Sequence, residues 1–115
     1  MTRASVTILE GSITALEVTG HAGYAQKGQD IVCAAVSCLT TTCINALEAV
    51  AKVKPVVRQD EQAAIVSVLL PDKLSPPQSH DAQIVLQTAL QGFRDIAGEY
   101  PKYFDLTIID GRKTP

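Results

Sequence analysis

Two side chains in the sequence have the chemistry to break an amide bond together. Cys33 lies near the start of an apolar segment, and His21 precedes it in a stretch rich in glycine. A thiolate is a strong nucleophile, and an imidazole within hydrogen-bond reach can take the proton from the sulfur and later give it to a leaving group. We therefore predict that Cys33 is a nucleophile and that His21 is its general base.

The predicted helix over residues 31–53 would place Cys33 where an anion is stabilised. Asp30 is a good N-cap, so Cys33 is expected in the first helical turn. The positive end of the helix dipole favours a thiolate there. The N–H groups of this turn have no partner within the helix, which makes the main chain of Cys33 and Ala34 a candidate oxyanion hole.

Each of these residues also has a purely structural interpretation. A cysteine in an apolar helix is most often a small core residue, and a lone histidine after a strand is usually a surface residue. We interpret Asp30 first as a helix cap, and a role in orienting His21 stays open. Ser37 lies one turn after Cys33 on the same face and is interpreted as bonding to the helix main chain, with a contact to the sulfur left open. His80 is interpreted as a surface or capping residue.

The segment between the second predicted strand and the first helix has no hydrophobic periodicity and contains three glycines. We predict a mobile loop that orders when substrate binds. Its key residues are expected to be Gly20, Ala22, Gly23, Tyr24 and Gly28. A phosphate-binding loop is the weaker interpretation, because neither GxxxxGK[ST] nor GxGxxG is present and Asp30 would repel phosphate.

The three cysteines, Cys33, Cys38 and Cys43, all fall in the first predicted helix. An odd number in a chain without an export signal argues against a disulfide framework. Cys33 and Cys43 would lie about 15 Å apart along the helix axis and cannot bind one metal ion. At least two of the three are expected to be buried packing residues. A thiol redox protein would need Cys38 as the resolving cysteine for Cys33. Because the two are five residues apart, Cys38 lies on another face of the helix.

Alternating and helical patterns predict the element order ββαββαβ. Strands are expected over residues 1–9, 13–19, 56–59, 63–70 and 103–109, with a turn at Glu10-Gly11-Ser12. The second helix is predicted to begin at a capping box formed by Ser75 and Gln78, with Ser79 as the rival cap. The residues of the first helix expected to pack on the sheet are Ile31, Ala35, Cys38, Leu39, Thr42, Ala46, Ala49, Val50 and Val53. The fold class is therefore α+β, a single domain over residues 1–115 with a mostly antiparallel or mixed sheet packed against two helices.

The net charge and the distribution of apolar residues argue against some classes of function. The formal net charge is -2, which gives no support for a nucleic-acid partner. No run of about 18 apolar residues suggests a membrane span, and the N-terminus does not resemble a signal peptide. We expect a cytoplasmic protein that uses neither a metal ion nor another cofactor.

The string Gly20-His21-Ala22-Gly23-Tyr24-Ala25, followed by Gly28 and by residues 30–37 (DIVCAAVS), closely resembles the signature of the ribosomal-processing cysteine protease family. The order of elements fits that family along the whole chain. The resemblance implies that Cys33 is the nucleophile and His21 the base. It also implies a homodimer that removes the N-terminal extension of a large-subunit bacterial ribosomal protein, with an apolar or aromatic side chain beside the cut.

The alternative from another functional class is a non-catalytic ribosome-associated binding or assembly module on the same fold. The net charge permits such a module to bind a basic ribosomal protein. Rapid alkylation of Cys33 at neutral pH would favour the enzyme, whereas an inert, buried thiol would favour the binding module.

Overall fold

The computed structural model describes residues 1–20 and 27–111, and only the main chain of residues 27–30. Within these residues the elements follow the predicted order ββαββαβ. The strands are β1 (Thr2–Leu9), β2 (Ser12–Thr19), β3 (Val56–Asp60), β4 (Ile65–Leu69) and β5 (Phe104–Asp110), and the helices are α1 (Lys27–Ala49) and α2 (Pro76–Glu99).

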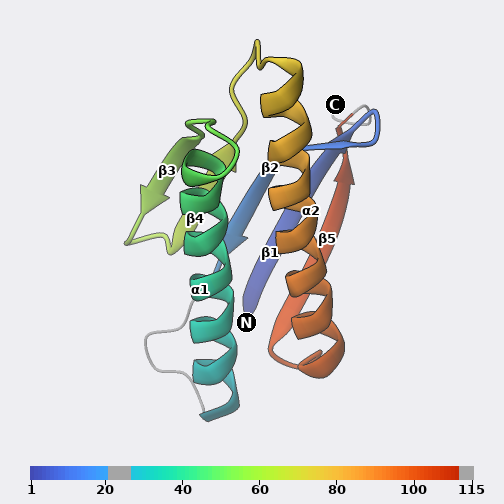
Figure 1. The fold of residues 1–115 in the computed structure, drawn as a ribbon. Coiled ribbons are helices and arrows are strands. Elements are labelled where there is room, and N and C mark those ends of the chain that lie inside the picture. Colours follow the sequence, from blue (N-terminus) through green and yellow to red (C-terminus); the bar gives the residue numbers. More distant parts are fainter. Residues whose placement is uncertain (21–26, 112–115) are drawn as a thin grey trace.

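The described strands form one mixed sheet in the order β3-β4-β2-β1-β5. β1 pairs antiparallel with β2 and parallel with β5, and β4 pairs antiparallel with both β2 and β3. Both helices cover the same face of this sheet, α1 on the side of β3 and β4 and α2 on the side of β5 (Figure 1). The predicted class, an α+β fold with a mixed sheet against two helices, is confirmed.

The turn between β1 and β2 forms where the sequence predicts it. Glu10 and Gly11 both have positive φ angles, 53° and 81°, the conformation that matches the twist of a two-residue hairpin. Further along, the register between the strands shifts next to Ile13. The side-chain amide of Gln83 on α2 bonds both the N–H and the carbonyl of Ile13, each at 2.8 Å. This pair of bonds ties α2 to the sheet at the irregular point of the hairpin.

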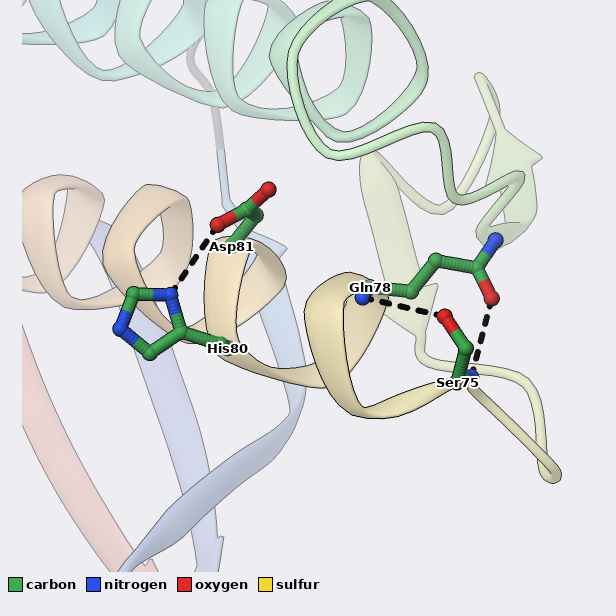
Figure 2. A network of polar contacts seen from close by, with 4 residues as sticks. All are labelled: Ser75, Gln78, His80 and Asp81. Atoms are coloured by element: carbon green, nitrogen blue, oxygen red, sulfur yellow. Dashed lines mark hydrogen bonds and ion pairs between the residues drawn. The ribbon is translucent and has the colours of Figure 1, made fainter.

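A capping box starts α2, as predicted (Figure 2). The Ser75 hydroxyl accepts from the main-chain N–H of Gln78 at 3.3 Å, and the Gln78 side chain accepts from the N–H of Ser75 at 3.0 Å. Gln78 also donates to the carbonyl of Lys52 at 2.7 Å, which joins the start of α2 to the segment that follows α1. Ser79, the rival cap, lies inside the helix, where its N–H bonds the Ser75 carbonyl.

The hydrophobic core fills the space between the helices and the sheet. The rings of Phe93 on α2 and Phe104 on β5 pack with centroids 5.9 Å apart. The two helices approach closely where Leu39 of α1 lies over Gly92 of α2. Further buried residues of the core are Ala4, Val6, Ile13, Leu16, Val32, Val36, Cys43, Leu47, Val53, Val68, Ala82, Leu86, Ala89 and Leu90.

The predicted bounds and buried face of the first helix are wrong. The helix runs over Lys27–Ala49, and the left-handed φ of 60° at Lys52 turns the chain so that Val53 enters the core after the helix has ended. The face against the sheet carries Val32, Val36, Cys43 and Leu47, whereas Ile31, Ala35, Cys38 and Val50 of the predicted face are exposed. This helix carries small and apolar residues on all of its sides, so the hydrophobic pattern did not single out the buried one.

One described helix is long and apolar enough to cross a membrane by length and composition alone, namely residues 31–49 of α1. The sequence shows no uninterrupted apolar run of this length, because serines and threonines are interspersed along the helix. Core helices of soluble proteins have the same length and composition. Here Val32, Val36 and Leu47 bury one side of α1 against the rest of the fold.

The capping box gives a test that separates the two rival serines. We expect Ser75→Ala to lower the free energy of unfolding by about 1 kcal/mol, because the N–H of Gln78 loses its acceptor. Ser79→Ala, at an exposed position within the same helix, is the matched control and should change stability by less than about 0.5 kcal/mol. Urea unfolding followed by circular dichroism measures both values. A larger loss for Ser79→Ala than for Ser75→Ala would contradict the capping assignment.

Candidate active site

Cys33 lies on α1 at the border between the buried side of the helix and its exposed side. Its neighbour Val32 is buried, Ala34 is exposed, and the cysteine itself is half-buried. The Sγ atom of Cys33 is 3.2 Å from the hydroxyl of Thr2, the first residue of β1. The sulfur is therefore held beside the sheet while remaining open on one side.

The start of α1 corrects four expectations about this segment. Because the helix begins at Lys27, Asp30 lies within it and is not its N-cap, and Gly28 belongs to the helix rather than to a loop. Cys33 then lies beyond the first turn. Its N–H and that of Ala34 take part in the helical hydrogen-bond pattern, so they do not form the predicted oxyanion hole.

His21, the predicted base, lies outside the described residues, as do Ala22, Gly23 and Tyr24. The residue before them, Gly20, is described and has a φ of 78°. Its N–H bonds the carbonyl of Ala64, and a Cβ atom at this position would overlap the main-chain carbonyl of Met1. Only glycine fits this conformation and this close approach, so Gly20 fixes the point at which the chain leaves the sheet toward His21.

A groove with a volume of about 650 Å³ opens next to Cys33. One wall is α1, which contributes Cys33, Ala34, Ser37 and Ile44. The opposite wall is the β3–β4 hairpin, through residues 59–61 and 64–66. Ser37, predicted to lie on the same face as Cys33, thus lines the same groove. An extended segment of another chain placed between these walls would pass the sulfur.

His80 is exposed and far from this arrangement in the sequence and the fold. Its Nδ1 lies 3.0 Å from the carboxylate of Asp81, the next residue on α2 (Figure 2). The side chains of His80 and Asp81 are 73% and 47% exposed, so neither is held in a desolvated site. The interpretation of His80 as a surface residue is confirmed, and the cap of α2 is formed by Ser75 instead.

The other two cysteines have different surroundings. Cys43 is buried in the core, and desolvation raises the pKa of its thiol from 9.0 to about 11. Cys38 is exposed. The prediction that at least two of the three cysteines are buried is wrong, because the helix turns Cys38 outward. Within residues 1–20 and 27–111, no cluster of histidine, cysteine and acidic side chains is suited to hold a metal ion.

The chain is similar to known proteins along most of its length. The sequence matches the family described as cysteine protease Prp over residues 1–105, which include His21 and Cys33. The ribosomal processing cysteine protease Prp of Bacillus subtilis is 30% identical over 88 residues, covering 76% of this chain and 79% of the relative. The protein of the same name from Staphylococcus aureus is 30% identical over 91 residues, covering 79% of this chain and 82% of the relative.

Solved structures share the fold. The crystal structure of SMU.848 from Streptococcus mutans superposes with a TM-score of 0.86 at 30% identity, covering 96% of this chain and 95% of that one. The essential ribosomal processing protease Prp from S. aureus, in complex with a substrate peptide, gives a TM-score of 0.83 at 27% identity, covering 94% and 99%. The likeness therefore extends over the sheet and both helices.

The contrast between Cys38 and Cys43 predicts a pattern of alkylation. At pH 8 a thiol with a pKa of about 11 is ionised in about one molecule in a thousand, and burial also blocks access to Cys43. We expect iodoacetamide to modify Cys38 and leave Cys43 intact in the native protein, as read by peptide mass spectrometry. In denaturing urea the two should react alike. Equal rates in the native protein would show that the core is open around Cys43.

Proposed function

Because the chain belongs to the cysteine protease Prp family, we propose that it removes the N-terminal extension of a large-subunit ribosomal protein. As a member of this family it is a cysteine peptidase of the ribosomal-processing type. The observation that carries the assignment of the site is the position of Cys33, whose sulfur lies beside a groove suited to an extended peptide. We place the protein in the cytoplasm, where its substrate is made.

Cys33 is the proposed nucleophile. Of the three cysteines, Cys43 is buried with a raised pKa, and Cys38 faces outward on α1. Cys33 alone among them lines the groove. It is also the cysteine that follows the glycine-rich segment in the family signature.

His21 is the proposed general base, on the strength of the sequence signature. The imidazole takes the proton from the Cys33 thiol as the sulfur attacks the scissile carbonyl carbon, forming a C–S bond. The C–N bond then breaks, and His21 gives the proton to the leaving amine. Water hydrolyses the thioester and returns the free thiol. The S. aureus relative has been crystallised in complex with a covalently linked product peptide, which supports a covalent intermediate.

The groove is the proposed site for the residues around the cut. Its walls present Ile44 from α1 and Ile65 and Val66 from β4, which suit an apolar or aromatic substrate side chain. The match to the S. aureus relative in complex with a substrate peptide covers 94% of this chain, which supports a peptide as the occupant. Neither nucleic acid nor a membrane surface has a part in this proposal.

The central test is cleavage of a peptide that spans the N-terminal extension of the ribosomal protein, read by mass spectrometry. We expect the wild-type protein to make a single cut. Cys33→Ala should fall below about a thousandth of the wild-type rate, because no other group can form the thioester. His21→Ala should lose a factor of about 10² to 10⁴, because the proton transfers lose their catalyst.

Cys38→Ala is the matched control, since it removes a thiol from the same helix on its outward side. It should cleave at the wild-type rate. Peptide that binds without being cut by the wild-type protein would favour the non-catalytic binding module. Cleavage by Cys33→Ala at the wild-type rate would rule out the assigned nucleophile.

We also propose that two copies of the chain associate, as the family resemblance implies. Analytical ultracentrifugation of the wild-type protein at micromolar concentration should give the mass of two chains. Dilution over a hundredfold range would reveal the equilibrium with the monomer. A monomer at every concentration would contradict the proposed dimer and leave the assignment of Cys33 untouched.

A further inference from the structure

Thr2 is a polar residue at a position where the fold requires an apolar one. Along β1 the residues that face the helices are Thr2, Ala4 and Val6, and all three are buried. The side chain of Thr2 is 1% exposed. A buried hydroxyl without a partner is unfavourable, so a threonine here needs a specific contact.

The contact is with the proposed nucleophile. The Oγ1 atom of Thr2 lies 3.2 Å from the Sγ atom of Cys33. The other buried polar side chain of the described residues, Thr40, bonds the carbonyl of Val36 one turn earlier in its own helix, at 2.7 Å. That bond explains Thr40 as a local feature of α1, whereas Thr2 reaches from the sheet to the helix.

The main chain around Thr2 holds its hydroxyl in place. The N–H of Thr2 donates to the carbonyl of Tyr103 at 3.2 Å, and Thr2 is the first residue of β1 paired with β5, opposite Phe104. β1 begins beside α1 (Figure 1). A β-branched side chain on a strand that is paired on this side has little freedom to turn away.

We propose that Thr2 is a positioning residue, which donates a hydrogen bond to the Cys33 thiolate and keeps the sulfur turned toward the groove. The proposal rests on the proposed function of Cys33 as nucleophile. A thiolate has no proton to donate and can only accept, whereas the hydroxyl can donate. A hydrogen bond to the charged form favours that form. The hydroxyl therefore fixes the direction of the sulfur and supplies a donor to its charged form.

The test compares Thr2→Val with Thr2→Ser in a Cys38→Ala background. Valine keeps the branched shape and removes the hydroxyl, whereas serine keeps the hydroxyl. We measure the alkylation rate of Cys33 from pH 5 to pH 10 and the pH dependence of kcat/KM for peptide cleavage. Thr2→Val should move the midpoint of both profiles upward by about one pH unit and slow alkylation about tenfold on the acid side. Thr2→Ser should restore the wild-type midpoint.

Val6→Ala is the control for a general loss of stability. Val6 is buried on the same face of the same strand and lies two residues beyond Ala4. It should lower the unfolding midpoint without moving either pH profile. If Thr2→Val does not fold, Thr2→Ala replaces it, and the same shift is expected.

The outcomes separate this inference from the proposed function. An unchanged midpoint in folded Thr2→Val or Thr2→Ala, with normal cleavage by the wild-type protein, would overturn the role of Thr2 and leave the peptidase assignment standing. A wild-type protein that neither cleaves the peptide nor alkylates at Cys33 faster than at an unfolded cysteine would overturn the proposed function itself. A midpoint of the pH profiles that shifts in Thr2→Val and returns to the wild-type value in Thr2→Ser would support Thr2 as the donor.

Discussion

The packing of one side of α1 against the sheet determines where the sulfur of Cys33 lies. Successive residues of a helix are rotated by about 100°, so burying Val32, Val36, Cys43 and Leu47 fixes the direction of every other side chain. Cys33 then lies about 70° from the centre of the buried stripe. At that angle the sulfur meets Thr2 on one side and the groove on the other. A fully buried sulfur would be inaccessible, and a fully exposed one would lack a fixed direction.

Local signals in the sequence predicted most of the elements of the fold. The ambiguous hydrophobic pattern of the first helix predicted the wrong buried side. The turn at Glu10-Gly11 and the capping box at Ser75 are determined by neighbouring residues, and both formed as expected. The buried side of α1 depends on contacts with distant segments. Choosing the stripe of Ile31 would have turned Cys33 about 165° away from the core, into solvent. The sheet order and the parallel pairing of β1 with β5 are likewise long-range features, for which the sequence carries no local signal.

Only the residues of the sequence motif could be predicted for the candidate site. The signature around His21 and Cys33 identifies the two proposed catalytic residues without any knowledge of the fold. Thr2 was missed, although a threonine alternating with the buried Ala4 and Val6 was a visible signal for a polar group facing the core. The resemblance implied an apolar groove near Cys33, but its walls could not be anticipated, because it forms between α1 and a hairpin that begins at Val56.

The parallel pairing of β1 with β5 has a consequence for the order of events during synthesis. β1 is synthesised before β5, and one of its two edges stays unpaired until β5 has followed. Contacts between residues so far apart in the chain form late and slowly. Because Thr2, which contacts the sulfur of Cys33, lies on a strand that β5 completes, the surroundings of this sulfur take their final form only after β5 has been made.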